Sequence, residues 1–199
     1  MKITTDMVKE LRTLTGAGVL EAKKTLEATD GDMDKAIQVL RQKGAARAEK
    51  RSDRDANEGI VELYAHPGNR VGVILELNCE TDFVARNEQF TDLAHNLALQ
   101  IAAMSPKYIN VEDVSEEDLE TELSVLRAQA QAEGKPEAIV EKIVSGRMAK
   151  YYEEVCLLEQ PYIRDEKVKI KDLITEAIST TGENIKVRRF ERYELGEAI

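Results

Sequence analysis

The sequence of 199 residues has no tryptophan, three phenylalanines, two histidines and two cysteines. Cys79 and Cys156 each lack a second cysteine nearby in the sequence, which argues against a disulfide framework or a zinc site. No apolar run approaches the ~20 residues that a bilayer-spanning helix needs, and the first ten residues, MKITTDMVKE, lack the apolar core of a signal peptide. We therefore expect a cytoplasmic protein without a membrane partner.

Positive charge is also in short supply, since 38 Asp and Glu outnumber 28 Lys and Arg for a net charge of −10. A dedicated nucleic-acid binder clusters Lys and Arg to release counterions from phosphates, so this balance favours a protein partner over direct nucleic-acid binding. Residues 1–58 hold 12 basic against 11 acidic residues, which leaves 16 against 27 for residues 59–199. This shift predicts a boundary near residue 58.

The first 45 residues predict a module of three short helices. Thr5 can cap a helix that ends at about Leu14, a second helix covers Val19–Ala28, and a third follows Asp32 and stops near Gly44. One face of each helix is apolar at helical spacing, with the inward residues Val8, Leu11, Leu14, Ala22, Leu26, Ala36, Ile37 and Leu40. Such a module has only a small core.

A charged stretch follows the module. From Arg41 to Asp55 the chain holds six basic and three acidic residues, so we interpret it as a solvated helix extension or linker. The basic run at 41–54 also permits an RNA- or ribosome-binding role, although acids interrupt it and no aromatic residue is available for base stacking. We divide the chain into a docking module at 1–45, a charged linker at 46–58 and a core at 59–199.

The core predicts a mixed fold. Gly59–Ala65 and Val71–Leu77 flank the turn sequence HPGN at 66–69, which is typical of a β-hairpin. Further helices are expected from about Asn87 to Pro106, from Ser115 to Gly134, from Pro136 to about Leu158 and over Lys171–Thr181, with a last strand at Asn184–Leu195. The predicted fold class is α+β, in which a small antiparallel sheet made of the hairpin and the last strand packs with several helices.

One apolar residue lies where the second strand gives way to a helix. The segment ELNCETDFVAR, residues 76–86, carries Phe83 between an acid and a branched apolar residue. Phe83 is either a buried residue that closes the hairpin core, as is usual for its type, or a side chain presented on a rigid turn to a partner's pocket. Composition does not separate these interpretations.

Recognisable catalytic sets are missing. The sequence shows no Ser-His-Asp or Cys-His combination, no metal-ligand cluster and no phosphate-binding loop. We therefore expect no metal, no other cofactor and no enzyme of covalent chemistry, but a scaffold that presents surfaces.

Two segments of the chain closely resemble sequence signatures of the translation elongation factor Ts family. They are Leu11–Val19 with the downstream Lys23, Lys24 and Leu26, and Glu76–Arg86. The segments Lys135–Met148, Glu159–Pro161 and Arg189–Gly196 are similar to further family segments, in family order, so the resemblance covers essentially the whole chain. It implies a guanine-nucleotide exchange factor for elongation factor Tu, the GTPase that carries aminoacyl-tRNA to the ribosome.

The resemblance also implies site residues. In this family an N-terminal module similar to ubiquitin-associated domains docks on the GTPase, and an Asp-Phe turn reaches its magnesium and phosphate region. Transferred to this sequence, Phe83 is the apolar side chain that enters this region of the GTPase, here called the wedge. Asp82 is its polar companion, and Thr81 and Val84 shape the turn. The docking end of the module comprises Leu11, Arg12, Gly16 and Val19.

Short members of the family are expected to pair through the core, so the resemblance implies a homodimer. Glu191 stands where some short members carry a cysteine, which predicts a non-covalent dimer. Two other functions remain open as alternatives. One is a protein adaptor that uses the helical module, and the other is the RNA- or ribosome-binding protein based on the 41–54 run.

Overall fold

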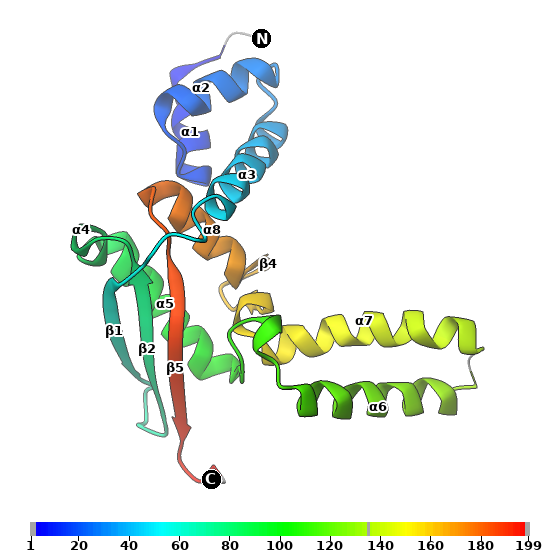
Figure 1. The fold of residues 1–199 in the computed structure, drawn as a ribbon. Helices are drawn as coiled ribbons and strands as arrows, with labels where there is room; N and C mark the ends of the chain where they lie inside the picture. Colours follow the sequence, from blue (N-terminus) through cyan, green and yellow to red (C-terminus); the bar gives the residue numbers. More distant parts are fainter. Residues whose placement is uncertain (1–2, 135, 198–199) are drawn as a thin grey trace. The chain divides into compact units, whose positions relative to one another are not determined.

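The computed structural model of the chain describes residues 3–134 and 136–197. The outer ends of the predicted segments 1–45 and 59–199, together with Lys135, lie outside the described residues. The described part contains eight α-helices, a three-stranded antiparallel sheet and a two-stranded sheet (Figure 1). The predicted α+β fold class is therefore confirmed.

The chain groups into two compact units whose boundaries fall inside strands and helices. Unit 1 comprises Met1–Leu63, Ile74–Asn96 and Asp172–Phe190, and unit 2 comprises Tyr64–Val73, Leu97–Lys171 and Glu191–Ile199. Several elements contribute residues to both units. The division into a module, a linker and a core remains a prediction.

The N-terminal module consists of helices α1 (Thr5–Thr15), α2 (Val19–Ala28) and α3 (Met33–Glu49). Thr4, and not Thr5 as predicted, caps α1 by accepting a 3.3 Å hydrogen bond from the Met7 amide. Asp32 caps α3 as predicted and accepts a 3.0 Å bond from the Lys35 amide. The three helices share a core of Val8, Leu11, Ala22, Leu26, Ala36 and Leu40.

Two details of the module differ from the sequence prediction. Leu14 is 50% exposed because Thr15 takes the inward position four residues after Leu11, and its hydroxyl donates a 2.6 Å bond to the Leu11 carbonyl. Helix α3 does not stop near Gly44 but continues to Glu49. Gly44 is buried against Ser179, so the glycine allows a close approach, and the alanine-rich sequence that follows favours helix.

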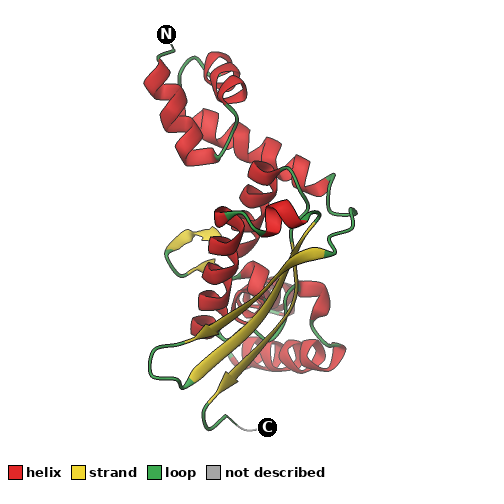
Figure 2. Cartoon of the chain, turned by 90° about the vertical axis from the view of Figure 1, so that its left-hand side faces the viewer, coloured by secondary structure: helices red, strands yellow, loops and turns green. Residues whose placement is uncertain are grey.

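The three-stranded sheet has the order β1-β2-β5 and consists of β1 (Glu58–Ala65), β2 (Val71–Cys79) and β5 (Lys186–Glu194) (Figure 2). In β2, Val73, Leu75 and Leu77 are buried, while Ile74 between them is exposed. This alternation gives the strand one core face and one outer face. Helix α5 (Glu88–Met104) adds the buried residues Phe90, Leu93, Ala94, Leu97, Ala98, Gln100, Ile101 and Ala102.

The remaining elements include the helices α6 (Glu116–Ala132) and α7 (Glu137–Val155), both of which the sequence predicted. They pack on each other as a helical hairpin, which was not predicted. Its own core contains Leu126, Ala130, Val140, Val144 and Met148. Short 3-10 helices lie at Val111–Asp113 and Leu157–Glu159. Strands β3 (Pro161–Tyr162) and β4 (Asp165–Lys169) were not predicted, because two residues are too few to show a period and DEKVK is mostly charged.

Helix α8 (Ile170–Thr181) precedes β5 and buries Ile170, Ile174 and Ile178. It ends at Gly182, whose φ of 79° is the left-handed conformation that glycine adopts readily at helix ends. Among the described residues, none of the helices is long and apolar enough to cross a membrane.

Candidate functional site

The segment between β2 and α5 contains a one-turn helix, α4 (Asp82–Ala85), where the sequence predicted a turn. Thr81 precedes it in an extended conformation, and its hydroxyl oxygen accepts a 3.5 Å bond from the Val84 amide. Ala85 faces the core, whereas the Phe83 side chain is 82% exposed. Phe83 is therefore presented to solvent, and the interpretation that it closes the hairpin core does not fit its exposure.

An ion pair flanks Phe83 on the same short helix. The Asp82 carboxylate lies 3.0 Å from the Arg86 guanidinium, four residues later, and both side chains are largely accessible to water. Exposed pairs at this spacing contribute about 0.3–0.5 kcal/mol, because solvent screens them and two long side chains must be ordered. The pair alone therefore cannot fix the orientation of α4.

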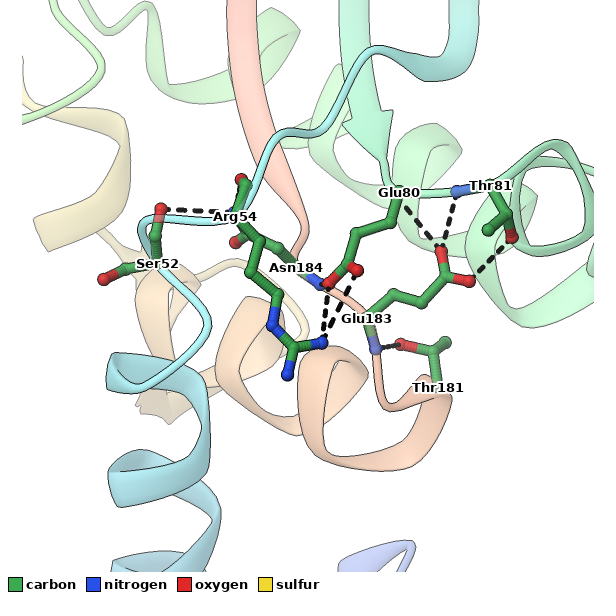
Figure 3. A network of polar contacts seen from close by, with 7 residues as sticks. All are labelled: Ser52, Arg54, Glu80, Thr81, Thr181, Glu183 and Asn184. Atoms are coloured by element: carbon green, nitrogen blue, oxygen red, sulfur yellow. Dashed lines mark hydrogen bonds and ion pairs between the residues drawn. The ribbon is translucent and has the colours of Figure 1, made fainter.

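The carboxylate of Glu183, two residues after the end of α8, binds the residues that directly precede α4 (Figure 3). Glu183 Oε2 accepts hydrogen bonds from the backbone amides of Glu80, at 3.1 Å, and Thr81, at 3.0 Å. Its other oxygen, Oε1, accepts a 2.6 Å bond from the Thr81 hydroxyl. Sequence reasoning missed Glu183, since no local pattern indicates a contact 102 residues away.

Glu80 and Asn184 connect the same two segments, but with donor and acceptor exchanged, because here the carboxylate lies after β2 and the backbone amide lies after α8. Glu80 Oε1 accepts a 2.7 Å bond from the Asn184 amide and lies 3.4 Å from the Arg54 guanidinium. The Asn184 side chain is 1% exposed, and its amide group donates to the carbonyls of Ser52, at 3.2 Å, and Arg54, at 2.7 Å. We call Glu80, Glu183 and Asn184 the brace, and part of the predicted linker 46–58 is bound to it (Figure 3).

Cys79 lies directly before the brace and is fully buried, with its Sγ 3.1 Å from the Thr81 carbonyl. Burial, and then the nearby charge of Glu183, raise the pKa of the Cys79 thiol to about 11. Burial likewise raises the pKa of Cys156 to about 11. Neither cysteine has the low pKa and exposure of a nucleophile. Residues 3–134 and 136–197 contain no group of three or more His, Cys, Asp or Glu that could hold a metal.

Of the four predicted docking residues of the module, Leu11 is buried and Arg12, Gly16 and Val19 are exposed. Leu11 is fully buried in the module core, so it can act only by holding the helices together. Arg12 is exposed and its Nε donates a 3.3 Å bond to the Ala17 carbonyl. Gly16 ends α1 with a φ of 63°, and Val19, at the start of α2, is 57% exposed.

Leu20, which sequence reasoning did not select, is exposed to 66% beside Val19. The signal for it was available, because Ala22 and Leu26 define the inward face of α2 and Leu20 lies off that face. Leu14 is also exposed at the end of α1. The junction between α1 and α2 therefore carries three exposed apolar residues, Leu14, Val19 and Leu20.

The basic run at 41–54 is partly used inside unit 1. Arg47 forms an ion pair with Glu21, and Arg54 forms one with Glu80. These contacts leave fewer positive charges for phosphate groups, which weakens the RNA-binding alternative.

The exposed apolar residues at the α1–α2 junction and at Phe83 lie in or directly beside the two signature segments noted in the sequence. The sequence model of the family elongation factor TS matches residues 20–197. The chain belongs to the elongation factor Ts family. Its curated relatives in that family include proteins named elongation factor Ts, so the chain is related to translation elongation factors.

Relatives from three organisms illustrate the match. The chain is 55% identical to elongation factor Ts of Carboxydothermus hydrogenoformans over 99% of the chain and 91% of that protein. It is 56% identical to elongation factor Ts of Thermotoga petrophila over 99% of the chain and 98% of the relative. For Moorella thermoacetica the values are 57% identity, 96% of the chain and 95% of the relative. The similarity to elongation factor Ts therefore extends over both units.

Proposed function

We propose that the chain is a guanine-nucleotide exchange factor for elongation factor Tu. It binds the GDP form, disturbs the magnesium and phosphate site through the Asp82-Phe83 turn, and releases GDP so that GTP can bind. The observation that supports this most directly is the 82% exposure of Phe83 on a turn held between β2 and α5. A solvent-exposed aromatic side chain on a turn between two ordered elements is suited to bind in a partner's pocket.

Exchange of this kind requires binding energy and no covalent chemistry. A GTPase holds GDP through backbone amides around the phosphates and a magnesium ion. A partner that binds the empty form more tightly than the GDP form weakens GDP binding by the same factor, by linkage. A coupling free energy of ~4 kcal/mol corresponds to roughly a thousandfold loss of GDP affinity.

Phe83 supplies part of that coupling if its pocket exists only in the open state of the GTPase. Burying a full phenylalanine side chain contributes about 2–3 kcal/mol. That free energy is gained only after the magnesium and phosphate region has moved, so it favours the state that releases GDP. Thr81 and Val84 shape the turn, and Asp82 is the polar companion that meets the polar rim of the site.

We assign binding to elongation factor Tu and disturbance of its nucleotide site to two different surfaces of the chain. Arg12, Gly16 and Val19 form the docking end of the module, while the buried Leu11 keeps α1 in place. Leu14 and Leu20 add exposed apolar side chains beside Val19 at this end of the module. We propose that this surface supplies affinity for elongation factor Tu and that the Phe83 turn converts the affinity into nucleotide release.

A non-covalent homodimer is part of the proposal. Val61 and Leu63 of β1 and Ile74 of β2 are exposed large apolar residues on strands of unit 1, and a second copy would cover them. Both cysteines are buried, which agrees with pairing without a disulfide. The proposal includes a cytoplasmic protein without direct nucleic-acid contacts.

Release of labelled GDP from elongation factor Tu, followed by stopped flow, tests the function. We expect the wild-type chain to accelerate release, and Phe83→Ala to slow the accelerated rate about 30- to 100-fold, from the burial free energy that is lost. The melting temperature should not change, since the ring is exposed. Tyr193→Ala, which removes another exposed aromatic ring, serves as the matched control.

No acceleration by the wild-type chain would overturn the exchange function. A folded Phe83→Ala variant that releases GDP at the wild-type rate would leave the exchange function standing and remove the wedge.

A further inference from the structure

The Phe83 side chain cannot set its own direction. It is 82% exposed, and α4, which carries it, contains four residues. A single turn of helix is unstable by itself, because fixing its backbone yields very few hydrogen bonds. The capping bond from the Val84 amide to Thr81 is also long, at 3.5 Å. The orientation of α4 must therefore come from contacts outside the turn.

Glu183 provides such contacts through both of its carboxylate oxygens. One oxygen accepts from two consecutive backbone amides, at Glu80 and Thr81, and the other accepts from the Thr81 hydroxyl. Hydrogen bonds to a charged acceptor are roughly twice as strong as bonds between neutral groups. The backbone that enters α4 is therefore held at two successive peptide groups.

The same carboxylate also sets the cap of α4. A carboxylate can only accept, so the Thr81 hydroxyl must donate its hydrogen to Glu183 Oε1. That leaves the lone pairs of the hydroxyl oxygen to accept from the Val84 amide, which is the capping bond. Glu183 thus controls the direction of the one side chain that begins the helix carrying Phe83.

Glu183 is itself fixed to the end of α8. Its backbone amide donates a 3.3 Å bond to the Thr181 hydroxyl oxygen, and that hydroxyl donates a 2.8 Å bond to the Ala177 carbonyl (Figure 3 shows the first of these bonds). The neighbouring Asn184 amide is bound by Glu80 at 2.7 Å. Both Glu183 and Asn184 therefore connect the residues before α4 to the segment that directly follows α8.

We propose that Glu183 is a positioning residue for nucleotide exchange. It binds the Glu80 and Thr81 amides and the Thr81 hydroxyl and thereby keeps α4 rigid. Phe83 then keeps its orientation when it contacts the partner, so that the binding free energy is used to displace the partner's residues and not the turn itself. The inference rests on the proposed exchange function for its kinetic consequence, and on the geometry of the isolated chain for its structural one.

Two measurements on the full chain test this role. In stopped-flow GDP release, Glu183→Ala should lower the maximal rate about 10- to 100-fold, because an unheld Phe83 turn loses part or all of the coupling that Phe83→Ala removes. The concentration of exchange factor at half-maximal rate should change less than about twofold, because the docking surface is intact. In hydrogen exchange of the free chain, the amides of residues 80–85 should exchange at least about tenfold faster.

Glu183→Gln is the conservative variant. Its amide oxygen can still accept from the two backbone amides, but without the charge that strengthens those bonds, and its NH2 group cannot accept from the Thr81 hydroxyl. We expect a maximal rate between those of the wild type and Glu183→Ala, and faster exchange of the 80–85 amides than in the wild type. Glu166→Ala removes an exposed carboxylate from β4 and is the matched control.

The outcomes distinguish a failure of the proposed exchange function from a failure of the positioning role of Glu183. If the wild-type chain fails to release GDP, the proposed function fails, but the hydrogen-exchange result still decides whether Glu183 holds the turn. If Phe83→Ala is slow and Glu183→Ala keeps the wild-type maximal rate, the positioning role is overturned and the wedge remains. If Glu183→Ala does not fold, Glu183→Gln decides by the same two readouts, and unchanged amide exchange in that variant overturns the proposal.

Discussion

At the Phe83 turn, the hydrogen bonds of the brace join residues 102–104 positions apart in the sequence. At the junction between α1 and α2, the bonds from Arg12 to Ala17 and from Ala17 to Thr15 span five and two residues. Both places expose apolar side chains, yet one is held by distant charged groups and the other by its own neighbours. In the proposed function, the Phe83 turn must resist displacement by the partner and therefore needs support from outside the turn, whereas the proposed docking surface needs only the helix pair beneath it.

The largest effect is expected on the stability of the three-helix module, which carries the proposed docking surface. Leu11→Ala should destabilise the module by about 2–5 kcal/mol, since it leaves a cavity in a small core. The measurement is urea denaturation followed by circular dichroism, together with hydrogen exchange of the 80–85 amides. Leu14→Ala removes an exposed leucine from the same helix and should be nearly neutral. Faster exchange at 80–85 in Leu11→Ala would show that the two regions are not held independently.

The second prediction uses the two buried cysteines as probes of opening. Both thiols are fully buried, and burial raises the pKa of each to about 11, so iodoacetamide labelling of the folded chain at neutral pH should be at least about 100-fold slower than in urea, where both thiols are accessible. If labelling requires opening, it should accelerate about tenfold per pH unit only up to about pH 8.5, the ordinary pKa of an exposed thiol, whereas labelling of the closed state would continue to accelerate toward pH 11. Glu183→Ala should speed labelling of Cys79, beside the brace, and leave Cys156 unchanged. Equal acceleration at both cysteines would indicate global loosening.

The third prediction tests the glycine at the α1–α2 junction. Gly16→Ala should destabilise the chain by about 1–3 kcal/mol, because φ is 63° and a Cβ would collide with the Thr180 hydroxyl. Gly18→Ala is the matched control, since φ is −64° there and no atom lies within 4 Å of the added Cβ. Thermal melting of both variants, and of Gly16→Ala combined with Thr180→Ala, separates the backbone strain from the collision. Equal melting temperatures for the two single variants would contradict this account.

The smallest effect is expected on the ion pair beside Phe83. Arg86→Gln should change the free energy of unfolding by less than about 0.5 kcal/mol, because the pair with Asp82 is exposed. Thermal melting at low and high salt measures this, with Arg164→Gln in unit 2 as an exposed arginine for comparison. A loss above about 1 kcal/mol would mean that the turn is held locally as well, and the contrast between the two regions would disappear.

Much of the fold followed from the sequence because its signals are local. Helical spacing and caps predicted α1, α2 and α5 to within a few residues, and the turn sequence at 66–69 predicted the hairpin. The errors have local causes too. Gly44 signals a helix end in sequence, but the helix continues past it because the glycine serves close packing against Ser179. The β3–β4 hairpin is too short and too charged to show a pattern.

The candidate site was predictable only in part. The motif around Phe83 selected the turn, but neither composition nor periodicity could tell an exposed ring from a buried one. Glu183 and Asn184 follow a helix-ending glycine and look like ordinary polar residues after a helix. Their contacts depend on how α8 packs, which is a tertiary property without a local signature.

The span of the brace has a consequence for the newly made chain. Thr81 leaves the ribosome well before Glu183, and 102 residues at about 5–20 residues per second take about 5–20 s to synthesise. During that interval Phe83 is attached to a strand and a helix whose closing contacts do not yet exist. On the proposed role of Glu183, the turn becomes rigid only after α8 and the residues that follow it have folded, so nucleotide exchange would begin only in the folded chain and not in a nascent one.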